Sequence, residues 1–333
     1  MASIRQLGER RENIASIVSF VRKNGAVTRM EIREALALSW ACVSDLAADL
    51  IREGVLLESA EVGRAPSAAK GRTPTRLLLN GQKYFLGVDI NDSGIAIARL
   101  SMNGETVASK KWAAELFSDE AALAGSVCEK IGQMLADPSD CCGIGVAMEG
   151  ARTEDGGWGY PMQGGAVSVH PEVFITRCFG MPVSVRHDPE CVLYSVAGER
   201  ADCLTVRVDR WIGIAAMKGG RILELPFELG WTRYGKRRLQ DILRSCAREG
   251  DYREIAEALG RSVGNLALLI GINACVLAGE ITEWIGSVRE EFDAAFREVS
   301  QHVSYELSDV SDASFGAARL AMAEYPSAKA ERA

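Results

Sequence analysis

Apolar residues in the first sixty positions recur at the spacing of an amphipathic helix in three successive stretches. In the first stretch, one face of the helix carries Ile14, Ile17, Val18 and Val21. Asn24-Gly25 predicts the end of this helix, because both residues tolerate the left-handed backbone that closes helices.

Capping signals mark the two helices that follow. Thr28 can cap a second helix, and Glu31 three residues later completes a capping box. We expect this helix to end at Leu38 and Ser39 to cap a third helix that runs to about Glu53. A short strand should then begin after Gly54.

The third helix has two chemically different faces. Val43, Leu46 and Leu50 would pack inward, which leaves a more polar face outward. Three helices followed by a strand are typical of a winged helix-turn-helix, which places its recognition helix in a DNA major groove. We predict this domain over residues 1–58. Its candidate DNA contacts are Thr28, Arg29, Ser39, Trp40, Ala41 and Ser44. The alternative is a small helical bundle that binds no nucleic acid.

A basic segment, residues 59–82, follows this domain. Its part from Ser59 to Arg76 contains four basic residues against the single acid Glu61, and two prolines that disfavour regular structure. Arginines in such segments enter narrow minor grooves. We therefore expect DNA contacts from Arg64, Lys70 and Arg72. A solvated linker between domains is a second, compatible interpretation.

Charge is distributed unevenly along the chain. Residues 1–80 hold 12 Lys and Arg against 9 Asp and Glu, a net charge of +3, and the remainder holds 26 against 36, a net charge of −10. A basic end on an acidic body favours DNA binding at that end only. Because no long apolar run, signal peptide or CxxC pair occurs, we expect a cytoplasmic protein without membrane contact and with reduced cysteines.

Strands and helices alternate after the linker. One series predicts strands over 84–90, 94–100 and 105–112, a helix over about 119–135, and a strand over 143–148. A second series predicts strands over 203–208, 212–217 and 221–224, helices over about 239–248, 252–259 and 263–270, and a strand over 275–278. This order is typical of an actin-like ATPase fold (ribonuclease H-like, α/β) with two lobes. We place lobe 1 at 83–200, with a C-terminal helix of about 308–325 returning to it, and lobe 2 at 201–307.

The chain resembles the ROK family, and within it the sugar-responsive transcriptional regulators of the N-acetylglucosamine and xylose repressor type. The resemblance covers roughly Glu12 to Met322. In the helical part it rests on Thr28–Ile32, Leu38-Ser39 and Val43-Ser44. In the body it rests on Gly87–Ile90, Gly143–Val146, Val185–Asp188 and Phe227–Gly230.

This chain departs from the family pattern at the phosphate-binding loops and at the zinc site. The resemblance implies two glycine-rich phosphate loops, but this chain has Asn91-Asp92-Ser93 and Asp209-Arg210-Trp211 there. A carboxylate would repel phosphate oxygens, which need backbone N–H groups. At the position of the family's zinc site, this chain has Trp231 and a cysteine-free stretch, residues 234–240. Gln240 stands near the position where the resemblance implies a further sugar-contacting Glu. We predict no ATP binding, no metal and no cofactor.

Two acids remain where the resemblance implies sugar contacts. Asp188 corresponds to the catalytic base of the kinases and would here accept hydrogen bonds from ligand hydroxyls. Alternatively, Asp188 caps a helix whose first turn contains Pro189. Glu228 is a ligand contact or a surface acid. His187 and Gln163 are further candidates, although a structural role for His187 is the more common case.

These features predict a DNA-binding transcriptional regulator, a repressor rather than an enzyme. Its partners would be a double-stranded operator, a carbohydrate-like effector and a second copy of itself, as a homodimer or tetramer. Two alternatives stay open. One is an active carbohydrate kinase with a DNA-binding head, and the other is an oligomeric DNA-binding protein without a ligand.

Overall fold

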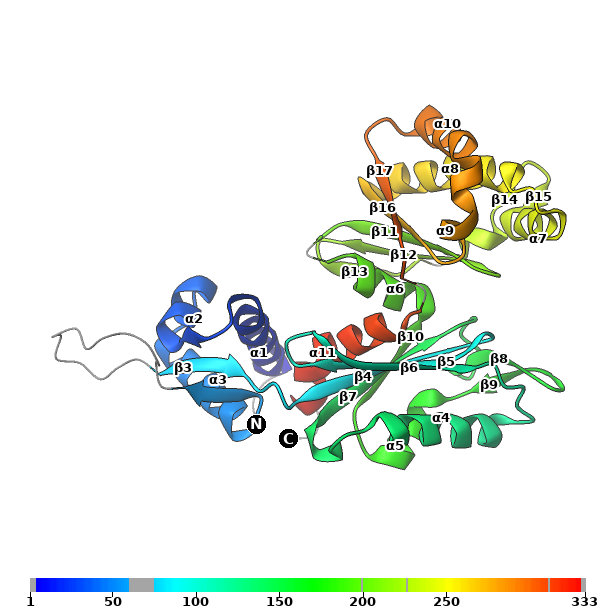
Figure 1. The fold of residues 1–333 in the computed structure, drawn as a ribbon. Helices are drawn as coiled ribbons and strands as arrows, with labels where there is room; N and C mark the ends of the chain where they lie inside the picture. The colour runs from blue at the N-terminus through cyan, green and yellow to red at the C-terminus, as the bar shows by residue number, and fades with distance from the viewer. Residues whose placement is uncertain (1–3, 60–74, 199, 226, 311, 331–333) are drawn as a thin grey trace.

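The computed structural model describes residues 4–330, apart from 60–74, 199, 226 and 311 (Figure 1). Three groups of elements follow one another along the chain. An N-terminal helical group with a small sheet comes first, and two five-stranded sheets with their helices follow it.

The N-terminal group contains three helices and an antiparallel sheet of strand order β1-β3-β2. Its elements are α1 (Ile4–Asn24), β1 (Val27–Thr28), α2 (Arg29–Leu36), α3 (Trp40–Arg52), β2 (Leu56–Ser59) and β3 (Arg76–Leu79). The sequence predicts no strand at β3, because Arg76 ends a basic, proline-containing segment. The strand forms because Leu77 and Leu79 are buried while the backbone pairs with both β1 and β2.

The predicted caps are confirmed. The Thr28 hydroxyl accepts a hydrogen bond from the Glu31 backbone N–H at 3.2 Å, and the Glu31 carboxylate accepts one from the Thr28 N–H at 2.6 Å. Ser39 caps α3 by accepting from the Cys42 N–H at 3.2 Å. The predicted end of the second helix at Leu38 is wrong by two residues, because Ala37 adopts a left-handed backbone with φ of 52°.

The first large sheet has the strand order β10-β7-β4-β5-β6. Helices α4 and α5 cover one face, and α6 and α11 cover the other (Figure 1). The bounds of these elements are β4 (Tyr84–Asn91), β5 (Gly94–Ser101), β6 (Thr106–Ala113), α4 (Glu120–Met134), β7 (Cys141–Met148), α5 (Pro171–Phe179), β10 (Val183–His187), α6 (Asp188–Val196) and α11 (Ser314–Ala330). A separate hairpin, β8 (Trp158–Met162) and β9 (Gly165–Val169), joins β7 to α5.

Two glycines of this sheet are required by the C-terminal helix. A Cβ atom on Gly87 would lie 1.8 Å from the carbonyl oxygen of Ser314, and one on Gly145 would lie 1.8 Å from that of Ala317. The backbone of α11 therefore packs directly on β4 and β7, which explains glycine at both positions. The helix predicted over about 308–325 begins later, at Ser314.

The second large sheet has the strand order β13-β12-β11-β16-β17. Its strands are β11 (Cys203–Val208), β12 (Ile212–Lys218), β13 (Arg221–Leu223), β16 (Ala274–Ala278) and β17 (Ser304–Ser308). Its helices are α7 (Leu239–Glu249), α8 (Arg253–Ile270), α9 (Ile281–Trp284) and α10 (Arg289–Val299). Smaller elements are β14 (Arg233–Tyr234), β15 (Arg237–Arg238) and the 3-10 turns η1 (Pro138–Asp140), η2 (Leu229–Trp231) and η3 (Ile285–Val288).

The two large sheets share one connection pattern. In the first, β4 pairs antiparallel with β5 and parallel with β7, and in the second, β11 pairs antiparallel with β12 and parallel with β16. The predicted α/β actin-like architecture is confirmed by this duplication and by the structural comparisons below.

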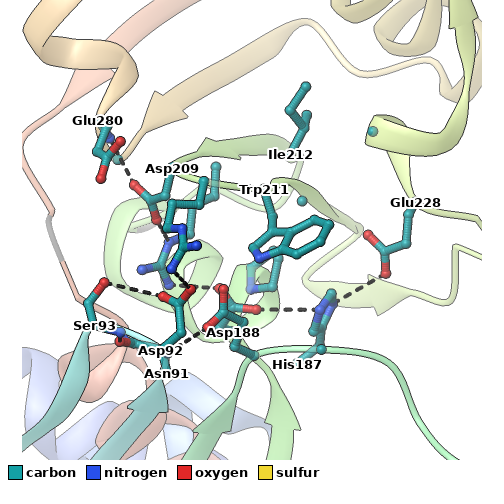
Figure 2. A pocket seen from close by; sticks show the side chains of 18 of the residues that line it. Asn91, Asp92, Ser93, His187, Asp188, Asp209, Trp211, Ile212, Glu228 and Glu280 are labelled. Carbon is teal, nitrogen blue, oxygen red and sulfur yellow. Dashed lines mark hydrogen bonds and ion pairs between the residues drawn. The ribbon is translucent and has the colours of Figure 1, made fainter. Parts of the chain in front are cut away.

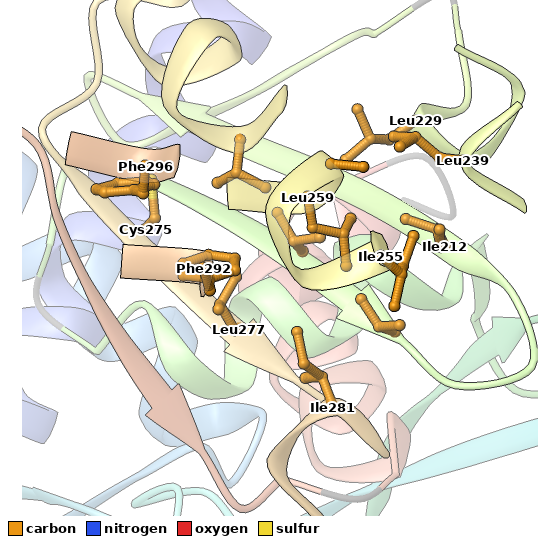
Figure 3. Packing of buried hydrophobic residues seen from close by; sticks show 14 of the residues in the cluster. Ile212, Leu229, Leu239, Ile255, Leu259, Cys275, Leu277, Ile281, Phe292 and Phe296 are labelled. Atoms are coloured by element: carbon orange, nitrogen blue, oxygen red, sulfur yellow. The ribbon is translucent and has the colours of Figure 1, made fainter. Parts of the chain in front are cut away.

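The second sheet packs on a core that includes Ile255, Leu259, Leu277, Phe292 and Phe296 (Figure 3). Two separate helices were expected over 252–259 and 263–270, but α8 is continuous. Gly260 and Gly264, which lie inside α8, allow close packing against α10. A Cβ atom at Gly260 would lie 2.5 Å from the carbonyl oxygen of Phe292.

Across the described residues, no helix is both long enough and apolar enough to cross a membrane.

Candidate functional site

A cavity of about 420 Å³ lies between the two large sheets (Figure 2). Loops at the ends of β4 and β7 and the first turn of α6 line it from one side. The β11–β12 turn and the segments around Glu228 and Glu280 line it from the other. Ligands of α/β folds commonly bind at such strand ends, so this cavity is the candidate site.

Asp188 sits at the start of α6 and is only 8 % exposed. Arg207 Nη1 donates a hydrogen bond to Asp188 Oδ2 at 2.8 Å, and Arg207 Nε donates to Asp209 Oδ2 at 2.5 Å. Burial raises the pKa of Asp188 to about 7, and Arg207 acts against this rise. Burial would lower the pKa of Arg207, but Asp188 and the neighbouring carboxylates raise it, so the guanidinium stays charged.

The interpretation of Asp188 as a helix cap is wrong. His187 holds the cap position of α6, and neither residue makes a side-chain capping bond. The Asp188 carboxylate turns instead toward Arg207 of the neighbouring sheet. Pro189 does occupy the first turn, and it lies so close to β12 that a Cβ atom on Gly213 would be 2.5 Å from its ring.

His187 links the two candidate acids. Its Nε2 lies 3.4 Å from Asp188 Oδ1, and its Nδ1 lies 3.8 Å from Glu228 Oε1 (Figure 2). The ring stacks on Trp158 with centroids 6.1 Å apart. Burial lowers the pKa of His187, although Glu228 opposes this, so the imidazole is neutral at pH 7. The structure therefore brings together Asp188, His187 and Glu228, whose side chain is 37 % exposed.

Gln163, the fourth candidate, does not line this cavity. It lies in the exposed turn between β8 and β9, where its side-chain Nε2 donates to the Leu116 carbonyl at 3.4 Å. The hairpin carries it away from Asp188, and a ligand contact would require movement of this turn.

The two segments that the resemblance matches to phosphate loops are bonded to carboxylates of the protein itself. The Asp92 backbone N–H donates to Glu149 Oε2 at 2.8 Å, and the Glu280 N–H donates to Asp209 Oδ1 at 2.8 Å. Asp92 also forms an ion pair with Arg210, which joins the two loops across the cavity. These N–H groups are therefore already bonded to acidic oxygens.

Sequence reasoning missed Glu149, Arg207 and the role of Gln240. Arg207 is a charged residue inside the apolar strand β11, a pattern that signals a buried partner. Glu149 follows directly after the buried strand β7, and burial raises its pKa to about 7. Gln240, 3 % exposed, accepts from the Ile212 N–H at 3.1 Å and donates to the Arg210 carbonyl at 2.7 Å. It thus holds the β11–β12 turn.

The segment that the resemblance matches to the family's zinc site is organised by other contacts. Trp231 is 56 % exposed, and the guanidinium of Arg238 lies 4.6 Å from its ring centroid. Tyr234 donates a hydrogen bond to Glu257 at 2.8 Å. In the part of the chain that the structure describes, no cluster of three or more His, Cys, Asp or Glu residues could hold a metal ion.

The candidate DNA contacts lie on the N-terminal group. The hydroxyls of Thr28 and Ser39 cap helices, and Arg29 pairs with Glu58 at 2.8 Å. On α3, Trp40 is 51 % exposed, Ala41 is exposed and Ser44 is half-buried. Arg64, Lys70 and Arg72 lie outside the described residues.

Solved structures of known proteins share this fold. A ROK family transcriptional regulator, described as a homolog of the E. coli MLC protein, matches with a TM-score of 0.77 and 16% identity, over 97% of this chain and 98% of that chain. A ROK family glucokinase from Streptomyces griseus, solved with glucose and AMPPNP, matches with a TM-score of 0.56 and 16% identity, over 71% of this chain and 98% of its own. A ROK hexokinase from Thermus thermophilus matches with a TM-score of 0.55 and 14% identity, over 71% and 97%.

No family model and no curated protein matches the chain. At these low identities, the structural likeness establishes the fold. The body has the two-lobed α/β fold of sugar kinases, and the whole chain has the fold of a ROK family transcriptional regulator, as the resemblance predicted.

Proposed function

We propose that this chain is a DNA-binding transcriptional regulator of the ROK type, with a sugar-kinase-like body that has lost kinase activity. The observation that carries the proposal is a difference in coverage. The regulator matches 97% of this chain, whereas the glucokinase matches 98% of its own length but only 71% of this chain. The part beyond the kinase body thus has its counterpart in a regulator.

In this proposal, residues 1–58 form a winged helix-turn-helix with α3 as the recognition helix. The exposed Trp40 and Ala41 on α3 support it, because a recognition helix presents its N-terminal residues to base edges. Residues 59–82 supply the basic wing and linker. Residues 83–200 with the C-terminal helix, and residues 201–307, form the two lobes. Dimerisation or tetramerisation through the body would place two heads on one operator.

The absence of kinase activity is supported by the phosphate loops. A phosphate oxygen would have to displace Glu149 from the Asp92 N–H and Asp209 from the Glu280 N–H. It would also meet the negative charge of Asp209 at short range. Catalysis of phosphoryl transfer depends on stabilising such negative charge, and this part of the cavity opposes it.

The effector is proposed to be a hydroxyl-rich, carbohydrate-like molecule. Asp188 and Glu228 line a cavity of about 420 Å³, and neutral His187 lies between them. Carboxylates accept hydrogen bonds from neighbouring hydroxyls, and each such charge-assisted bond contributes about 1.5–3 kcal/mol. A ligand here contacts both lobes, so it would favour one lobe orientation and one spacing of the DNA-binding heads.

Gel-shift titrations on DNA fragments flanking its own gene test the DNA-binding part. Arg72→Ala should weaken binding and reduce the slope of log affinity against log salt by about one. Arg253→Ala on α8, an exposed arginine of the second lobe, is the matched control and should change neither. Equal slopes for Arg72→Ala and the unaltered protein would remove the linker from the interface.

A coupled assay of ADP release over a panel of sugars tests the non-enzyme part. We expect no release above background. Release that disappears in Asp188→Asn would overturn this part and favour the alternative of an active carbohydrate kinase with a DNA-binding head.

A further inference from the structure

Two cysteines of the first lobe lie in direct contact. The Sγ atoms of Cys128, on α4, and Cys178, on α5, are 2.8 Å apart. All nine cysteines of the chain are free thiols in this structure. The two reduced thiols therefore need to approach each other by less than about 1 Å to reach the length of a disulfide bond.

The surroundings of the two sulfur atoms differ. Cys178 is exposed and Cys128 is half-buried. Burial, together with the neighbouring Cys178, raises the pKa of the Cys128 thiol to about 12. An oxidant from solvent therefore meets Cys178 first, with Cys128 behind it.

We propose that Cys128 and Cys178 form a reversible disulfide that links α4 to α5 when the protein meets hydrogen peroxide. The Cys178 sulfur attacks the peroxide O–O bond, gains one hydroxyl as a sulfenic acid and releases water. The Cys128 sulfur then attacks the Cys178 sulfur, the S–O bond breaks, and the oxygen leaves as a second water with the Cys128 proton. One peroxide is reduced to two waters while two thiols become one disulfide, and a dithiol reductant reverses the step.

The bond would join two helices on one face of the first sheet (Figure 1). The closed segment from 128 to 178 contains β7, the hairpin β8–β9 and the cavity residue Glu149. Closing a segment of this length restricts the unfolded chain, which stabilises the folded state. Oxidation would also fix α5, which leads through β10 to His187.

The test treats the reduced full-length protein with hydrogen peroxide and then maps its peptides without reduction. We expect a cross-linked peptide pair containing Cys128 and Cys178, a mass loss of about 2 Da per chain, and a melting temperature that rises by several degrees. A dithiol should reverse all three changes.

Cys178→Ser and Cys128→Ala should each remove the cross-link and the rise in melting temperature. Cys42→Ser, which alters a half-buried thiol on α3, should keep both. Should Cys128→Ala prove unstable, Cys178→Ser alone decides, because its side chain is exposed. Peroxide that yields only sulfinic acid at Cys178, or a disulfide between two chains through Cys178, would overturn the proposal.

Discussion

The two sides of the cavity have different chemistry. On the side of residues 91–93 and 209–211, called here the phosphate side after the proposed loss of phosphate binding, Asp92, Glu149 and Asp209 are engaged with backbone N–H groups or arginines of the chain itself. On the other side, Asp188 is paired with Arg207 through Oδ2, but its Oδ1 and Glu228 Oε1 meet only His187, at 3.4 and 3.8 Å. The first side is satisfied without a ligand, whereas the second keeps hydrogen-bonding capacity that a ligand could use.

Arg207 connects the two sides, since it donates to both Asp188 and Asp209. Arg207→Met should give the largest effect, because it leaves buried carboxylates without a cation. Removing one partner of a buried pair costs about 3–5 kcal/mol. Chemical denaturation measures this, with Arg210→Met, which changes an exposed arginine three residues away, as the control. A loss below that of the control would show that the two sides are not coupled through Arg207.

Asp188→Asn tests the ligand side. Any sugar that raises the melting temperature of the unaltered protein should bind about 10- to 100-fold more weakly to this variant, because a charge-assisted hydrogen bond is lost. Calorimetric titration with that sugar measures the change. Glu190→Gln is the matched control, since Glu190 lies on the same helix but outside the cavity lining. Equal affinities in Asp188→Asn and Glu190→Gln would favour the alternative of a body without a ligand.

Glu149→Gln tests the phosphate side through pH. Burial raises the pKa of Glu149 from its usual 4.5 to about 7, so the folded state holds a proton that the unfolded state releases. The stabilisation is complete below pH 4.5 and is lost progressively as pH rises to about 7. Melting temperatures across this window should therefore fall less steeply with pH in Glu149→Gln. Asp188 contributes in the same direction, so part of the slope should remain.

The sequence predicted the elements whose signals are local. The capping box of Thr28 and Glu31, the cap at Ser39 and the strands of both sheets depend on neighbouring residues and were found at or near their places. The contacts that fill the phosphate side join residues far apart in the chain. Asp92 is paired with Arg210, 118 positions away, and no periodicity predicts such a pair.

The predicted break between helices at 252–259 and 263–270 is wrong for the same reason. Gly260 and Gly264 lie inside α8, where α10 approaches too closely for a side chain. Close approach of a distant backbone and a local turn both select glycine. Only the tertiary structure distinguishes them.

Arg210→Ala should have the smallest effect. Its side chain is 68 % exposed, and its ion pair with Asp92 is open to solvent, so its loss should cost less than about 1 kcal/mol of folding stability. If the polar groups of the phosphate side bond only to one another and not to a ligand, the variant should bind the same sugars as the unaltered protein, with unchanged affinity. It should also remain without a melting-temperature response to ATP, because Glu149 and Asp209 still occupy the backbone N–H groups. A melting temperature that rises with ATP in Arg210→Ala would contradict this expectation. It would mean that this one arginine, rather than the carboxylates, excludes the nucleotide. The contrast between the two sides of the cavity would then depend on a single surface residue.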